Sequence, residues 1–193
     1  IDYDICGKII VATAENELEI LQNIYNTGVE NGLKGLKFLN PEEIKEIEPN
    51  CIGLRAILVP QAGIINYKQV AKKLVDILYN KQVQIKFNEE VNDIIAGDEV
   101  KIVTKNNSFK AKHLINCGGL FSDRLANHTD KDRNLRIIPF RGEYYELRPE
   151  SEKLVNNLIY PVPNPSFPFL GVHFTRMIEG GVEAGPNAVL AFK

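Results

Sequence analysis

The sequence has few of the features that mark membrane-spanning, disulfide-bonded or nucleic-acid-binding proteins. No apolar run reaches the roughly 18 residues that a membrane-spanning helix needs. Its three cysteines, Cys6, Cys51 and Cys117, are an odd number without metal-site spacing, which indicates reduced thiols. The net charge of −2 gives no reason to expect a nucleic-acid partner. We therefore expect a cytoplasmic protein, with peripheral attachment to the inner membrane left open.

The composition is that of a globular protein. Of the 193 residues, 44% are hydrophobic, which is enough for a buried core in one large domain or two small ones. The chain starts at Ile1 and stops within an apolar run, residues 188–193, whereas domains usually end in polar, exposed sequence. We therefore expect an internal fragment of a longer protein, truncated at both ends.

Helical and strand-like patterns succeed one another along the chain. Helices are predicted over residues 15–25, from a cap at Asn40 to a stop at Pro49, and over 67–80. Strands are predicted over 8–12, 56–60, 83–87, 91–96, 100–105, 108–117, 135–147, 171–178 and 181–184. These patterns predict an α+β fold.

The segment 114–124 carries the clearest local signal. A short apolar run ends at Gly118 and Gly119 and opens into helical spacing, which predicts a strand, a tight turn and a helix start. Backbone N–H groups at a helix start can hold a phosphate-like anion. The alternative is an ordinary connection between a strand and a helix, and this segment alone does not decide between the two.

Residues 67–124 resemble the flavin-binding part of the glycine oxidase and D-amino-acid oxidase superfamily, in which a helix, a strand and a meander lead into an Asn-x-x-Gly-like turn. The resemblance implies FAD as the cofactor. It implies that the backbone of Val91 contacts the adenine. It also implies that the turn formed by Asn116, Cys117, Gly118 and Gly119 packs against the adenosine and pyrophosphate.

Five further motifs extend the resemblance over nearly the whole chain, at residues 59–64, 140–145, 160–163, 171–176 and 185–188. Together they are similar to the L-2-hydroxyglutarate dehydrogenase and oxidase family. The resemblance implies oxidation of L-2-hydroxyglutarate, a small 2-hydroxy acid, to 2-oxoglutarate by hydride transfer to FAD. The electrons would leave to oxygen or a membrane quinone.

The resemblance divides the chain into three portions. It implies an α/β-type, partial FAD-binding portion at 59–130, and a mixed-sheet substrate-binding portion at 1–58 and 131–193. One departure is that no G-x-G-x-x-G fingerprint occurs, because Gly28, Gly32 and Gly35 are spaced differently. We therefore expect that this chain alone does not hold FAD tightly. The alternatives are a related flavin-dependent enzyme acting on an amino acid or glycerol phosphate, or a folded fragment inactive on its own.

His173 is the best candidate for the catalytic base. Strand alternation turns it away from its apolar neighbours Val172 and Phe174, and imidazole exchanges protons near neutral pH. A structural histidine is the alternative. His113 and His128 are weaker candidates because they lie in polar surroundings.

Four residues are candidates for substrate binding. Two carboxylates call for arginine forks, for which Arg141 and Arg176 are available. Tyr145 shares a strand face with Arg141 and could donate to a carboxylate, whereas Arg176 has odd spacing from His173 and lies on the opposite face unless a bulge intervenes. Asn187 is a turn residue by propensity, and the family likeness adds a polar site role.

Overall fold

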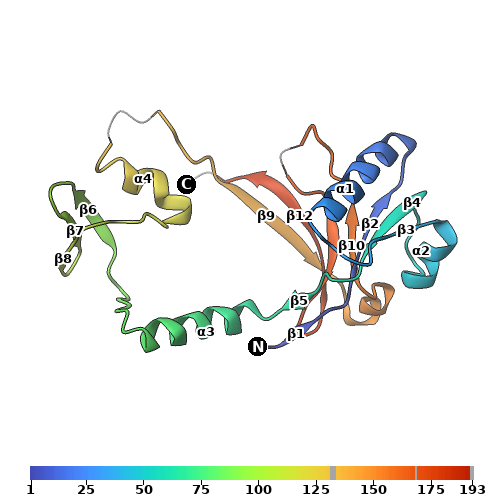
Figure 1. The fold of residues 1–193 in the computed structure, drawn as a ribbon, viewed down its shortest axis with the longest axis horizontal. Coiled ribbons are helices and arrows are strands. Elements are labelled where there is room, and N and C mark those ends of the chain that lie inside the picture. The colour runs from blue at the N-terminus through green and yellow to red at the C-terminus, as the bar shows by residue number, and fades with distance from the viewer. Residues whose placement is uncertain (131–133, 168, 192–193) are drawn as a thin grey trace. The chain divides into compact units, whose positions relative to one another are not determined.

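The computed structural model describes residues 1–130, 134–167 and 169–191. The chain divides into two compact units: the first holds residues 1–76 and 141–189, and the second holds 77–140 and 190–193 (Figure 1). Helices accompany a mixed sheet, which confirms the predicted α+β class. Residues 59–76 group with the first unit, although the resemblance associates them with flavin binding.

A seven-stranded sheet forms the centre of the first unit, in the order β3-β4-β2-β10-β11-β12-β9 (Figure 1). Strands β2 and β10 pair in parallel, and the pairs β2–β4, β3–β4, β10–β11 and β11–β12 are antiparallel. Their bounds are β2 Lys8–Ala12, β3 Lys37–Leu39, β4 Arg55–Val59, β9 Phe140–Glu146, β10 Leu158–Pro161, β11 His173–Arg176 and β12 Val182–Leu190. A separate short pair joins β1 (Tyr3–Asp4) to β5 (Ile64–Ile65).

Apolar residues alternate along β2 and cover both faces of this sheet. Ile9 and Val11 pack with Ile44 of α2 (Pro41–Ile47), and Ala12 packs with Leu21 of α1 (Leu18–Glu30). A 3-10 turn at Glu15–Glu17 precedes α1, and another lies at Pro149–Leu154. Removing both apolar faces from water is the main stabilising contribution in this unit.

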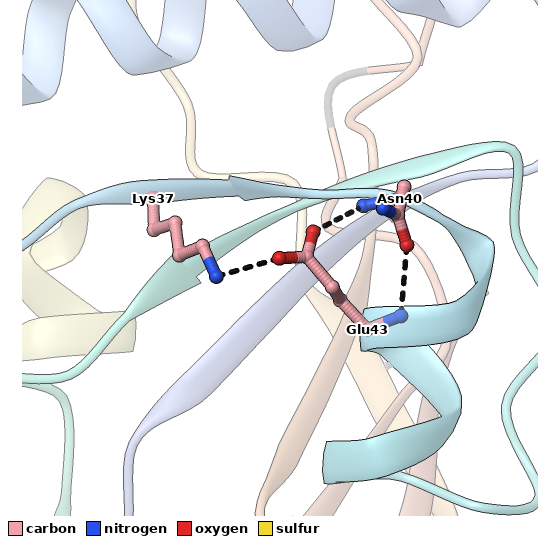
Figure 2. A network of polar contacts seen from close by, with 3 residues as sticks. All are labelled: Lys37, Asn40 and Glu43. Atoms are coloured by element: carbon pink, nitrogen blue, oxygen red, sulfur yellow. Dashed lines mark hydrogen bonds and ion pairs between the residues drawn. The ribbon is translucent and has the colours of Figure 1, made fainter.

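The predicted start of α2 is confirmed, and Figure 2 shows its capping network. Asn40 Oδ1 accepts a hydrogen bond from the Glu43 backbone N–H at 2.9 Å, and Glu43 Oε2 accepts one from the Asn40 N–H at 2.9 Å. Lys37 Nζ lies 2.6 Å from Glu43 Oε1. The pKa of Glu43 is lowered, first by the hydrogen bond from Lys37 and then by the one from the Asn40 backbone. The network joins the first residue of β3 and the cap at Asn40 to the first turn of α2.

The second unit contains a three-stranded antiparallel meander, β6 (Val91–Ile95), β7 (Val100–Thr104) and β8 (Ser108–Ala111). A 3-10 turn at Gly119–Phe121 leads into α4 (Ser122–Ala126), and α3 (Tyr67–Asn80) contributes residues to both units. The strand prediction at 83–87 is wrong, and the strand predicted at 108–117 ends at Ala111, so its second part, 112–117, is wrong as well. Neither run has a neighbouring strand, among the residues described, to take its backbone hydrogen bonds.

Candidate active site

His173 lies buried at the start of β11, with 7% of its surface exposed. Its Nδ1 is 2.9 Å from the carbonyl oxygen of Gly171, and its ring stacks on Tyr160 with centroids 4.1 Å apart and planes inclined by 17°. A carbonyl only accepts hydrogen bonds, so Nδ1 carries the proton in the neutral ring and Nε2 carries the free electron pair. Among the residues described, Nε2 makes no hydrogen bond. The geometry leaves this nitrogen available to accept a proton.

Lys8 approaches the same stack from the neighbouring strand. Strand β10 lies between β2 and β11, so Tyr160 stands between Lys8 on one side and His173 on the other. Lys8 Nζ lies 4.9 Å from the centroid of the Tyr160 ring, in a cation–π contact. Burial lowers the pKa of the Lys8 ammonium. Sequence reasoning missed Lys8 because its parallel pairing with β10 has no local signal.

Gly185 lies on β12, the strand between β11 and β9 in the sheet. It pairs with His173, so a Cβ added to Gly185 would point to the same face as the imidazole. That Cβ would lie 2.6 Å from Cδ1 of Tyr144 and 2.8 Å from the Glu143 carbonyl oxygen. Glycine is therefore required for Tyr144 to pack here. Tyr144 is a second residue of this face that sequence reasoning did not select.

Arg141 and Tyr145 share one face of β9, as predicted. Alternation along the strand turns both away from the face that carries Tyr144. The Nε and Nη2 atoms of Arg141 donate to Glu143 Oε1 at 3.1 and 2.6 Å. The structure therefore pairs Arg141 with a carboxylate on its own strand and does not bring it to His173.

Arg176 is engaged in contacts within the first unit. Its Nη1 donates to the carbonyl oxygen of Asn156 at 2.8 Å, and its Nη2 lies 3.7 Å from Asp4 Oδ2. Strand β11 pairs regularly with β12, so no bulge turns Arg176 to the face of His173. These contacts support a structural role.

Asn187 is exposed on β12 and lines a hollow of about 540 Å³. Gly171, whose carbonyl binds His173, lines the same hollow, together with Val162 and Pro186. Asn187 therefore shares a hollow with Gly171, the residue whose carbonyl oxygen contacts His173.

In the second unit, the predicted turn is closed by its own side chains. Asn116 Nδ2 donates to the Ser122 carbonyl at 2.8 Å, and its Oδ1 accepts from the Gly118 N–H at 3.0 Å. Gly119 has a φ of +54°, which favours glycine. A Cβ on Gly118 would lie 2.5 Å from Leu125 Cδ1, so glycine also permits the close approach of α4.

This turn borders a second hollow, of about 430 Å³. Its lining includes Val91 and Gly118, which the resemblance associated with the cofactor, and also Glu90, Phe121, Arg124, Leu125 and His128. His128 Nδ1 lies 2.8 Å from Asp93 Oδ1. Cys117 is exposed and Asn116 braces the turn from within. The structure therefore brings Val91 and Gly118 together at one hollow.

Solved structures of other proteins have folds similar to that of this chain. The fold is similar to that of L-alpha-glycerophosphate oxidase from Mycoplasma pneumoniae with FAD bound, with a TM-score of 0.81 and 26% identity over 97% of this chain and 50% of that one. It is also similar to L-proline dehydrogenase from P. horikoshii, with a TM-score of 0.83 and 14% identity over 100% of this chain and 52% of that one. The chain thus shares its fold with about half of an oxidase that binds FAD.

Comparison of the sequence identifies the family to which the chain belongs. The chain belongs to the FAD dependent oxidoreductase family, DAO, which matches residues 1–192. It is 48% identical to L-2-hydroxyglutarate dehydrogenase of Indibacter alkaliphilus and 42% identical to the mitochondrial human enzyme of that name, across 100% of this chain. It covers 49% and 44% of those proteins, so the chain spans about half the length of the curated relatives it matches.

The hollow beside Gly118 fits a part of the family's cofactor. Val91, Leu125 and Phe121 supply apolar surface suited to a flat ring, and Arg124 adds a cation beside them, with its guanidinium carbon 5.2 Å from the Phe121 centroid. The absence of a Cβ at Gly118 allows the turn to pack closely against α4.

No described helix is both long and apolar enough to cross a membrane.

Proposed function

We propose that the protein oxidises L-2-hydroxyglutarate to 2-oxoglutarate, with FAD supplying the hydride acceptor. The observation that carries this proposal is the 48% identity, along the whole chain, to a protein named L-2-hydroxyglutarate dehydrogenase. The position of His173 agrees with it, because oxidation of a hydroxyl requires a group that removes its proton.

His173 is the proposed base. The Gly171 carbonyl holds Nδ1 and the Tyr160 ring holds the plane, so Nε2 is oriented to receive the hydroxyl proton. Asn187 is the proposed polar contact to the substrate. The observed contacts of Arg141 and Arg176 support structural roles for these two residues. We assign a structural role to Tyr145 as well, because it shares a face of β9 with Arg141.

We assign the first unit to substrate binding and the second to the adenosine end of FAD. Support for the second assignment is the hollow that Val91 and Gly118 share, beside the turn that Asn116 braces. In this assignment Gly119 and Cys117 present backbone to the cofactor. The sequence contains no G-x-G-x-x-G segment, so the main pyrophosphate site is not formed by these 193 residues.

The proposed path of the electrons ends at oxygen or a membrane quinone, with the protein in the cytoplasm or peripheral to the inner membrane. Reduction of a soluble quinone analogue in the absence of oxygen would identify the acceptor. Oxygen uptake that accounts for all turnover would exclude the quinone.

A substrate screen tests the proposed reaction. The complete gene product would be assayed with a dye acceptor against L-2-hydroxyglutarate, its D enantiomer, glycine, L-proline and glycerol 3-phosphate. We expect turnover of L-2-hydroxyglutarate well above that of the others. Preference for an amine or for glycerol phosphate would replace this proposal by the alternative within the superfamily.

A further inference from the structure

Lys8 is a half-buried cation at the start of β2. Among the residues described, its ammonium makes no hydrogen bond or ion pair, and it contacts the ring of Tyr160. Burial lowers the pKa of this group, with no opposing carboxylate. Withdrawing a charge from water without a partner is unfavourable, and binding an anion would offset that cost.

The position of Lys8 relative to His173 follows from the sheet. Tyr160 separates the two, with Lys8 Nζ 4.9 Å and the His173 ring centre 4.1 Å from its own centre, so they lie no more than about 9 Å apart. Lys8 and Tyr160 point to one face because Lys8 pairs with Leu158, two residues before Tyr160. One ligand on this face could therefore reach both groups.

A hydroxy diacid of five carbons is long enough to reach both groups. Three carbon–carbon bonds separate its hydroxyl-bearing carbon from the distal carboxylate, so the hydroxyl oxygen and that carboxylate lie up to about 6 Å apart. A hydrogen bond of about 2.8 Å at each end would give an extended molecule a reach of about 11 Å, so a diacid held between groups no more than about 9 Å apart binds in a bent conformation.

We propose that Lys8 binds the distal carboxylate of the substrate and so selects a diacid over a monoacid. This inference rests on the proposed function, in which His173 takes the hydroxyl proton. The two arginines that sequence reasoning offered for a carboxylate are held elsewhere, Arg141 by Glu143 and Arg176 by Asn156 and Asp4. Lys8 lies across the Tyr160 ring from the imidazole and, among the residues described, makes no ion pair.

Two substrates and one substitution test the proposal. L-2-hydroxyvalerate has the length of L-2-hydroxyglutarate but carries a methyl group in place of the distal carboxylate. In the complete gene product, Lys8→Met should lower kcat/KM for the diacid about 30- to 100-fold, mainly through KM, because a charge-assisted contact is lost. The value for the monoacid should change by less than about 3-fold.

Two further variants sharpen the comparison. Lys8→Arg keeps the charge and should restore much of the preference for the diacid. Lys45→Met removes an exposed lysine from α2 and should leave both substrates unaffected. Both substrates are measured on the same preparation, so their ratio does not depend on how much of a variant folds.

The outcomes separate the two proposals. If Lys8→Met lowers kcat/KM for both acids by the same factor, Lys8 has only a structural role and the inference is overturned, while the proposed reaction stands. If the unaltered protein does not oxidise L-2-hydroxyglutarate, the proposed function fails and the assignment of Lys8 fails with it.

Discussion

At the scale of single residues, His173 combines burial with a ring fixed at one nitrogen and free at the other. His173→Gln in the complete gene product should lower kcat for L-2-hydroxyglutarate about 10²- to 10⁴-fold with little change in KM. Glutamine has a similar size but cannot take the proton. Stopped-flow measurement of the decrease in flavin absorbance would give the rate of the chemical step.

His113→Gln is the matched control for that experiment. His113 is exposed and, among the residues described, makes no hydrogen bond, so its replacement should leave kcat unchanged. Full flavin reduction at the unaltered rate in His173→Gln would show that the base is another group.

Gly185 shows how one missing Cβ shapes the face of His173. Gly185→Ala should destabilise the protein by about 1 to 3 kcal/mol, because the new methyl would meet both the Tyr144 ring and backbone. Denaturant unfolding would measure the loss. Gly97→Ala is the control, since the nearest atom to its Cβ is at 3.4 Å. Equal unfolding midpoints for the two variants would contradict the described packing.

Strand alternation predicted which residues of β9 share a face, but not which face meets His173. That choice depends on the pairing of β9 with β12, where the Leu147 N–H donates to the Val182 carbonyl at 2.8 Å. Register between distant strands has no signal in either strand alone. The sequence therefore supported Tyr145, whereas the structure turns Tyr144 to that face.

At the scale of elements, the end of α2 is fixed by a buried carboxylate. Glu48 accepts backbone hydrogen bonds from Asn156 at 2.9 Å and Asn157 at 2.6 Å, one on each oxygen. Glu48→Gln should cost about 1 to 3 kcal/mol, because an amide N–H₂ would face one backbone donor. Thermal unfolding would measure it.

Glu46→Gln, on the exposed side of α2, is the control for Glu48 and should change stability little. A Glu48→Gln protein as stable as the Glu46→Gln protein would show that the two backbone donors find other partners.

The start of α2 should make stability depend on pH. The pKa of Glu43 is lowered in the folded protein, so its contribution is present above the ordinary carboxyl pKa and is lost as pH falls through the lowered value. Glu43→Gln should therefore reduce the melting temperature at neutral pH and have a diminishing effect in acid. A difference between the two proteins that stays constant down to strongly acidic pH would contradict this linkage.

Local sequence signals predicted those elements whose first and last residues are marked by a cap or by the end of a periodic pattern. The helix from Tyr67 to Asn80 was predicted at its observed bounds, and the helix after Asn40 began at its cap. The helix predicted at 15–25 begins after a 3-10 turn and continues to Glu30, since its buried face extends as far as Gly28. Strand-like runs at 83–87 and 112–117 failed because a strand also needs a partner, which local sequence does not supply.

At the scale of the whole molecule, the 193-residue chain should bind FAD weakly when isolated. It has the turn at Gly118 and Gly119 but no G-x-G-x-x-G segment for the pyrophosphate. Purified with excess FAD and then desalted, it should be colourless and inactive. A stable flavin absorbance band after desalting would show that the hollow beside Val91 suffices.

The seven-stranded sheet has a consequence for how the chain is made. Strand β2 leaves the ribosome about 50 residues before its partner β4 and about 150 residues before its parallel partner β10, as the pairing of Lys8 with Val59 and with Leu158 shows. Until then one edge of an apolar central strand stays open to other chains. Slow translation or a low supply of chaperones should therefore lower the yield of this protein through aggregation before synthesis ends.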